Sequence, residues 1–269
     1  MKRRNRLRSV VATGVALMLM GWGVAAAPIS VFVVHCEPTN ARPEMWLELV
    51  DLVALADANG VPLTILFTAQ WAEMILSDAA KVAALESWLA AGHEIGCHHH
   101  AYWAVKDRAS SWDGYTNTPK DDLEPTDRAQ YRGTMDDYMA LLSALPGERR
   151  TGCLGLDERD EVDWLCQLEY STAGYALDDG IGAPRSLERN GCPVLEIGHG
   201  LLPGERRGAW QDAYRACVEG EILGVNAHVY NFAEFPAIFD VWFSFLHAED
   251  PSGESRLTVA ELLDSWDDT

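Results

Sequence analysis

Basic residues are scarce in this chain. Its 269 residues include 21 Lys and Arg against 41 Asp and Glu, which gives a formal net charge of −20 at pH 7. Five of the 21 basic residues fall within residues 2–8, so the remainder has 16 basic residues against the same 41 acidic ones. Such a surface repels phosphate backbones, and we expect no nucleic acid among its partners. Neutral sugars, amino sugars and cations are compatible with it.

Two cysteine patterns are missing. The chain has no Cys-x-x-Cys pair, which argues against a thioredoxin-like site and a zinc ribbon. The six cysteines are Cys36, Cys97, Cys153, Cys166, Cys192 and Cys217. An even number permits disulfides in an exported chain without requiring them. For Cys36 and Cys97, a disulfide and simple packing both stay open, with metal ligation as a third alternative.

A long apolar run occurs only at the N-terminus. Residues 10–27 carry no charge, follow the basic segment 2–8 and end in three alanines. This order is typical of a secretory signal peptide, so we expect residues 1–26 to be removed and the protein to be secreted or periplasmic. An uncleaved membrane anchor is the alternative, because the run nearly reaches spanning length. We expect residues 27–269 to form one domain without membrane contact.

Short apolar runs alternate with amphipathic segments over the rest of the chain. This alternation is typical of βαβ units and predicts an α/β barrel with a mainly parallel sheet. Strands are predicted at 29–34, 63–67, 93–97, 151–156, 169–173, 194–197 and 222–227. Helices are predicted at 43–59, 78–91, 126–145, 209–218, 235–246 and 258–266. A long polar loop at 104–125 is also predicted, and loops of this length are often functional.

Histidines gather where three of the predicted strands end. The first strand leads into His35-Cys36-Glu37, the third into Cys97 and the run 98–100 of three histidines, and the last into Asn226-Ala227-His228. Five of the eight histidines lie at these three ends. Because sites in parallel α/β sheets gather at the carboxyl edge of the strands, these residues are the first candidates for function.

The residue types at these strand ends suit a divalent metal. A catalytic zinc site uses three protein ligands and keeps one position open, and imidazole and carboxylate are suitable ligands. Glu37 and two of the three consecutive histidines would supply such a set. The metal would lower the pKa of a water, while a nearby base and acid would handle its proton and the leaving group. Histidine runs also occur in ordinary surface loops, which is the alternative to a metal site.

One segment resembles a known family. Residues 92–98 read Gly-His-Glu-Ile-Gly-Cys-His, which is similar to the GHEIGNH motif of the polysaccharide deacetylases, the NodB-homology carbohydrate esterases. Residues 63–67 and 222–228 look like further strands of that family, and the resemblance covers most of residues 29–262 in order. It implies a distorted (β/α) barrel with fewer than eight regular units. It also implies metal-dependent removal of acyl groups, usually N-acetyl, from a carbohydrate, with zinc as the expected cofactor.

The first motif departs from the family pattern. The family has TFDDG, in which one Asp is the base and the next binds the metal, whereas this chain has Val-His-Cys-Glu-Pro at 34–38. The resemblance therefore implies that Glu37 is a metal ligand and places Cys36, a poor base, at the base position. We expect His35 to serve as the base instead, since it lies two residues from Glu37 and on the same face of an extended strand.

The second and last motifs supply the other expected site residues. The resemblance implies that His98 binds the metal and that His228 is the acid that protonates the leaving group. The family has a second His four residues after the first, but position 102 is Tyr. The second imidazole must then come from His99 or His100, and we prefer His100.

Three residues are expected to contact the substrate. They are Trp112 and Asp113 in the long loop and Tyr230 after the last strand, although Asp113 also suits an ordinary turn. Two alternatives to a deacetylase remain. One is a non-catalytic barrel that binds a glycan or a metal, because the paired Asp of the family is missing. The other is a glycoside hydrolase, which needs two carboxylates across a cleft and would use Glu37 and Glu196.

Overall fold

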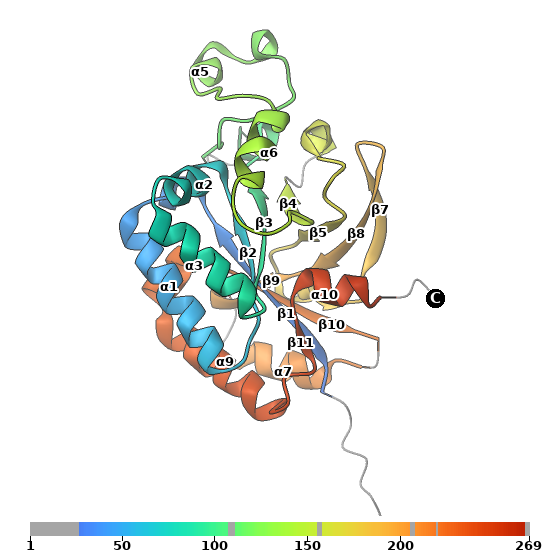
Figure 1. The fold of residues 1–269 in the computed structure, drawn as a ribbon. Coiled ribbons are helices and arrows are strands. Elements are labelled where there is room, and N and C mark those ends of the chain that lie inside the picture. Colours follow the sequence, from blue (N-terminus) through green and yellow to red (C-terminus); the bar gives the residue numbers. More distant parts are fainter. Residues whose placement is uncertain (1–26, 107–110, 155–157, 205–207, 219, 267–269) are drawn as a thin grey trace, which may run out of the picture.

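A curled, mainly parallel sheet forms the centre of the molecule (Figure 1). The computed structural model describes residues 27–106, 111–154, 158–204, 208–218 and 220–266, so the predicted signal peptide lies outside the described residues. Neighbouring strands follow the order β6-β10-β1-β2-β3-β4-β5-β8-β7, and β11 and β9 pair with β1 and β10. The strands are β1 (Ile29–Cys36), β2 (Thr64–Phe67), β3 (Glu94–His99), β4 (Thr151–Leu154), β5 (Tyr170–Ala173), β6 (Ile181–Gly182), β7 (Arg185–Arg189), β8 (Cys192–Gly198), β9 (Gly200–Leu201), β10 (Ile222–His228) and β11 (Arg256–Leu257).

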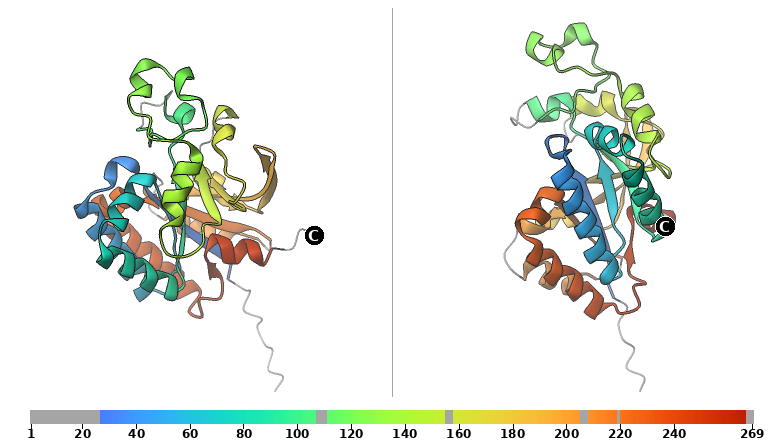
Figure 2. Two further views of the ribbon diagram at one scale, coloured as in Figure 1. Left: turned by 45° about the horizontal axis from the view of Figure 1, so that its top comes forward. Right: turned by 60° about the vertical axis from the view of Figure 1, so that its left-hand side comes forward.

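Helices pack around the curled sheet. They are α1 (Pro43–Ala58), α2 (Ala69–Leu76), α3 (Ala79–Ala90), α4 (Tyr102–Lys106), α5 (Pro125–Arg128), α6 (Met135–Ser143), α7 (Ala209–Ala216), α8 (Val229–Glu234), α9 (Pro236–Glu249) and α10 (Val259–Asp264). In Figure 1, α1, α3 and α9 lie on one side of the sheet, and the segment that carries α5 projects away from the rest of the chain, as Figure 2 also shows. The predicted fold class, a distorted (β/α) barrel with fewer than eight regular units, is confirmed. Among the described residues, no helix is both long and apolar enough to span a bilayer.

Side-chain alternation along the strands separates an outer and an inner face. On β1, Phe32 and Val34 belong to the large core under the helices, whereas Val31 and Val33 belong to a smaller core that α10 covers. Since successive side chains of a strand point to opposite faces, His35 continues the inner row. The register pairs His35 with His228 on β10 and His98 on β3 with Cys153 on β4. Several polar side chains are therefore directed toward the inside of the barrel.

The predicted helix at 126–145 is wrong. Helix α5 ends at Arg128, and α6 begins only after Thr134, whose side chain accepts a hydrogen bond from the backbone N–H of Asp137 in a capping box. The intervening segment pairs with the long loop instead, where the N–H of Arg132 donates to the carbonyl of Gly114 at 2.7 Å. Contacts distant in sequence thus override a continuous helical pattern.

The antiparallel strand β7 was also not predicted. Its sequence, Arg-Ser-Leu-Glu-Arg, is too polar to predict a buried strand. The polar side chains fit its position, because β7 lies at the edge of the sheet beside β8. The turn between the two strands is Asn190-Gly191, with positive φ at both residues (49° and 76°). An Asn-Gly pair with these angles is the strongest short-range signal for a hairpin.

The cysteines divide into one pair and four free thiols within the described part of the chain. Cys166 and Cys192 form a disulfide, with Cα atoms 5.5 Å apart. Cys36 and Cys97 are free and completely buried. Of the alternatives left open for these two residues, packing as small apolar groups is the one found.

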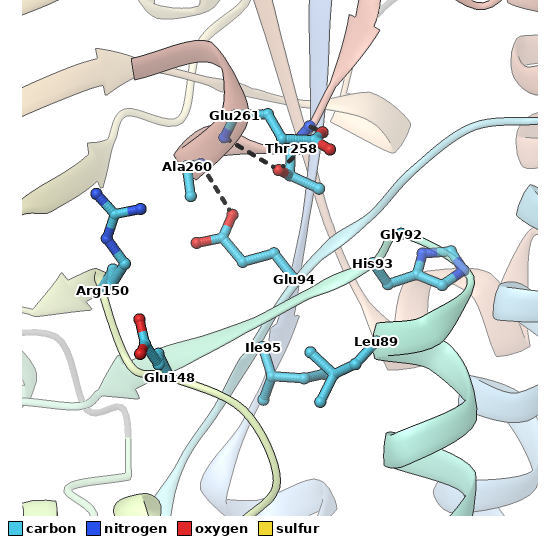
Figure 3. A pocket seen from close by; sticks show the side chains of 10 residues that line it. All are labelled: Leu89, Gly92, His93, Glu94, Ile95, Glu148, Arg150, Thr258, Ala260 and Glu261. Atoms are coloured by element: carbon cyan, nitrogen blue, oxygen red, sulfur yellow. Dashed lines mark hydrogen bonds between the residues drawn. The ribbon is translucent and has the colours of Figure 1, made fainter. Parts of the chain in front are cut away.

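A pocket opens near the start of β3, at the amino end of the strand and therefore away from the strand-end histidines (Figure 3). Glu94 from the GHEIG segment lies in its wall. Its carboxylate accepts hydrogen bonds from the hydroxyl of Thr64 at 2.9 Å, from the hydroxyl of Thr151, and from the N–H of Ala260 at 3.1 Å. Glu94 thus connects β2, β3, β4 and the first turn of α10.

We expect Glu94→Gln to destabilise the fold by about 1–3 kcal/mol, because one acceptor oxygen is replaced by a donor that faces other donors. Denaturant unfolding of the two proteins measures the difference. Glu148→Gln is the matched control, since Glu148 lines the same pocket with an exposed side chain. Equal losses in both variants would show that the three hydrogen bonds of Glu94 contribute nothing.

Candidate metal centre

The carboxylate of Glu37 stands at the centre of three imidazoles. Glu37 follows β1 directly, where its backbone carbonyl accepts a hydrogen bond from the indole N–H of Trp71 at 2.9 Å. Its Oε2 atom lies 2.5 Å from Nε2 of His100, and its Oε1 atom lies 3.0 Å from Nε2 of His228 and 3.4 Å from Nε2 of His98. Ligand atoms of Glu37, His98 and His100 all lie within 4.8 Å of one another. The structure thus brings together the three predicted ligands and places His228 beside them.

The other ring nitrogen of each imidazole has a partner. Nδ1 of His98 lies 3.2 Å from the carbonyl oxygen of Cys153, and Nδ1 of His100 lies 2.9 Å from that of Ser111. Nδ1 of His228 lies 3.0 Å from Oδ1 of Asn231. Because these partners are acceptors, each Nδ1 carries a proton, and each Nε2 faces the carboxylate of Glu37. This is the arrangement in which metal-binding histidines are held in proteins.

The carboxylate of Glu37 requires a positive charge beside it, which a protonated imidazole or a bound cation can supply. Burial alone would raise the pKa of Glu37, but hydrogen bonds with the imidazoles outweigh burial and hold this pKa well below its ordinary value. Burial likewise lowers the pKa of His100, but Glu37 outweighs it and the net shift is upward. Nε2 of His98 is buried and has no hydrogen-bond partner. A divalent cation fits this set, since it can replace the Nε2 protons and bind the carboxylate and the imidazoles at once.

His99 points to the opposite face of β3. Its Nδ1 lies 2.7 Å from Oδ2 of Asp113, and its Nε2 lies 3.5 Å from Oδ2 of Asp163. Burial by itself lowers the pKa of His99, but the two aspartates raise it to about 10. His99 is therefore a buried cation that fastens the loop around Asp113 to the strand, and the preference for His100 over His99 as the inward imidazole agrees with the structure.

His35, the predicted base, lies behind His98. The two rings are stacked, with centroids 4.5 Å apart and an interplanar angle of 13°. Burial lowers the pKa of His35 well below its ordinary value, so the ring is neutral. Its Nε2 atom is buried without a hydrogen-bond partner.

The predicted substrate contacts have different environments. Tyr230 is 37% exposed, and its ring stacks on His228 with centroids 4.9 Å apart. Trp112 is half-buried, donates its indole N–H to the carbonyl of Tyr115 at 2.9 Å and packs on Tyr102. Asp113 is only 1% exposed, and its carboxylate also accepts hydrogen bonds from the N–H groups of His100 and Tyr115. The expectation that Asp113 contacts substrate therefore needs correction, because its carboxylate is fully used inside the protein.

Glu196 does not complete a pair of catalytic carboxylates. It is 2% exposed, and its carboxylate lies 2.7 Å from Arg185 and 2.5 Å from Arg189, both on β7. The hydroxyl of Ser171 donates to it at 3.0 Å. A glycoside hydrolase that uses Glu37 and Glu196 is therefore excluded, since Glu196 is held by a hairpin strand that was not predicted.

Sequence reasoning missed the residues that support the ligands. Trp71 and Asn231 orient Glu37 and His228, and the backbone carbonyls of Ser111 and Cys153 orient the other two imidazoles. Asn231 had a local signal, because it lies three residues after His228 at the start of a helix, where such side chains commonly bond to the backbone. The carbonyl partners had none, since any residue type supplies a carbonyl.

Similar proteins were found by structure alone. No protein-family model matches the sequence, and no curated protein matches it significantly. A protein described as a candidate polysaccharide deacetylase from Mycobacterium smegmatis matches with a TM-score of 0.53 and 12% identity, over 89% of this chain and 91% of its own. A 4-alpha-glucanotransferase from Thermococcus litoralis matches with a TM-score of 0.54 and 13% identity, over 90% of this chain and 41% of its own.

A candidate polysaccharide deacetylase from Bordetella bronchiseptica, described as involved in O-antigen biosynthesis, matches with a TM-score of 0.41 and 11% identity, over 81% of this chain and 88% of its own. Identities this low show the fold and not the activity. The chain thus has a distant, fold-level similarity to the Mycobacterium smegmatis protein described as a candidate polysaccharide deacetylase.

Proposed function

We propose that Glu37, His98 and His100 bind a divalent metal, with zinc as the expected ion, and that the chain hydrolyses acyl groups from a carbohydrate. The observation that carries this proposal is the convergence of three Nε2 atoms on one half-buried carboxylate at the carboxyl edge of a barrel. The similarity to a candidate polysaccharide deacetylase supports the substrate class. When bound at such a site, a divalent metal polarises a carbonyl and lowers the pKa of a water to about 7.

His228 is the residue that we assign to proton transfer. Asn231 holds the proton on Nδ1, so Nε2, which lies 3.0 Å from Oε1 of Glu37, is the nitrogen that can exchange a proton with a substrate at the edge of the site. The side chain of His228 is 12% exposed, so a leaving group can reach it. His35 has no such position, because its ring is stacked behind His98. Tyr230, stacked on His228, offers a half-open aromatic face on which a sugar ring can pack.

His228→Gln is expected to lower kcat for acetate release about 10²- to 10⁴-fold while metal content stays unchanged, because general acid–base catalysis contributes about that factor. Acetate released from N-acetylated and O-acetylated sugars by the zinc-loaded chain measures kcat. The same assay after chelation tests the metal requirement, and we expect acetate release to stop and to return when zinc is added.

His247→Gln is the matched control, since His247 is exposed on α9, and it should behave as the unmodified chain. Full activity after complete removal of metal would contradict the hydrolase proposal. Full activity of the His228 variant would contradict the role of His228 alone.

A non-catalytic barrel is the second candidate, and one observation favours it. The position of the family's base is occupied by Cys36, which is fully buried, and burial raises the pKa of its thiol well above the ordinary value. A chain that binds zinc at the Glu37 site but releases acetate from none of the sugars would support this candidate.

We also propose that the chain is exported. The charge and apolar pattern of residues 1–27 supports export, and so does the Cys166–Cys192 disulfide, because such bonds persist in oxidising compartments.

A further inference from the structure

A second group of metal-ligating side chains lies inside the barrel, next to the Glu37 site. It consists of His35 on β1, Cys153 on β4 and His199, which follows β8, and we call it the inner cluster. One ligand atom from each residue lies within 4.8 Å of the other two. The rings of His35 and His199 have centroids 5.1 Å apart at an interplanar angle of 68°. Residues on β1, on β4 and directly after β8 thus meet at one point, although they are distant in sequence.

Three of the four ring nitrogens of the inner cluster lack partners. Nε2 of His35 and both ring nitrogens of His199 are buried without any hydrogen bond. His199 is 1% exposed and His35 is 4% exposed, so bulk solvent does not reach these nitrogens. A buried polar atom without a partner is costly, and most such atoms in folded proteins are satisfied. Three of them around one thiol indicate a ligand.

We propose that the inner cluster binds a second divalent cation through His35, Cys153 and His199. The donor set selects the class of cation, because a thiolate with two imidazoles suits zinc and similar soft or borderline ions rather than magnesium or calcium. Binding replaces the proton of the Cys153 thiol, which is released to solvent. Three protein ligands leave one position open for a further group.

The two sites are neighbours but differ in chemistry. The stacked rings of His35 and His98 form their common wall, so the two cations would lie side by side inside the barrel. The Glu37 site has a carboxylate ligand and the inner cluster a thiolate ligand, so metal binding to each site can be measured separately. This second site also gives His35 a different role from the one expected, because a nitrogen lone pair that binds a cation cannot accept a proton. The proposal stands independently of the proposed hydrolase function.

Cobalt(II) is the probe, because a cobalt–thiolate bond gives a charge-transfer absorption that a carboxylate or imidazole does not. We expect the chain to bind two cobalt ions and to show this band. Cys153→Ser should bind one cobalt ion and lose the band, whereas Glu37→Gln should bind one and keep it. Cys217→Ser is the matched control, since Cys217 is a free, half-buried cysteine at the end of α7, and it should bind two ions and keep the band.

A measurement on the unmodified chain keeps the proposal testable if a variant fails to fold. X-ray absorption of the zinc-loaded protein should show a sulfur atom bonded to half of the zinc. The absence of sulfur around the zinc, or a charge-transfer band that survives in a folded Cys153→Ser chain, would overturn the inner site. Either result would overturn the inner site and leave the proposed Glu37 site standing. The Glu37 site is tested separately, by metal binding to the Glu37→Gln variant.

Discussion

Replacing Glu37 by Gln is expected to weaken metal binding at the Glu37 site by at least about 100-fold and to abolish acetate release. The substitution keeps the size of the side chain but removes the negative charge at the point where three imidazole nitrogens converge. Losing a residue that merely orients a ligand already costs about 10- to 100-fold in metal affinity, so the loss of a ligand should cost more. Calorimetric titration with zinc measures the affinity.

The titration is cleanest in a Cys153→Ser background, which leaves the Glu37 site alone to bind. Glu44→Gln provides a matched control, because Glu44 lies exposed in the first turn of α1, outside the barrel interior. If Glu37→Gln bound zinc as tightly as this control, the carboxylate would not be a ligand and the proposed centre would be wrong.

His99→Gln is expected to destabilise the metal-free fold by about 3–5 kcal/mol near pH 6, because it leaves Asp113 and Asp163 buried without their cation. The loss should depend on pH. The ordinary pKa of 6.5 is raised to about 10 in the folded chain, so the protonated ring contributes fully below pH 6.5. This contribution declines as the pH rises from 6.5 through about 10.

Denaturant unfolding in the presence of a chelator, at pH 6 and near pH 10, measures the difference between the two proteins. His247→Gln, an exposed substitution, should change stability by less than about 0.5 kcal/mol at either pH. A loss for His99→Gln that is the same at both pH values would mean that the ring of His99 is not protonated in the fold.

Much of the site followed from periodicity and strand order. The position of Glu37, His98 and His228 directly after apolar strands predicted that they would meet, because parallel strands end at one edge of the sheet. The preference for His100 over His99 had no such support in the prediction, although the period of two along β3 now accounts for it. The inference about the strand ends uses only neighbouring residues and one general rule of sheet architecture.

The remaining features depend on contacts that no local pattern encodes. Asp113 looked like a turn residue near a site, and only the folded chain shows that it is the buried partner of His99. Glu196 looked like a strand-end carboxylate, but a charged hairpin strand folds back onto it. Cys153 and His199 attracted no attention because each stands alone in the sequence, and they meet His35 only when the sheet curls.

The three consecutive histidines show that position along a strand can matter more than residue type. His98 and His100 face Glu37, whereas His99 between them is a cation held by two aspartates. A shift of β3 by one residue would exchange these roles, because it moves every side chain to the other face. Three consecutive histidines look interchangeable in the sequence. We nevertheless expect β3 not to tolerate the insertion or deletion of one residue, even when all three histidines are retained.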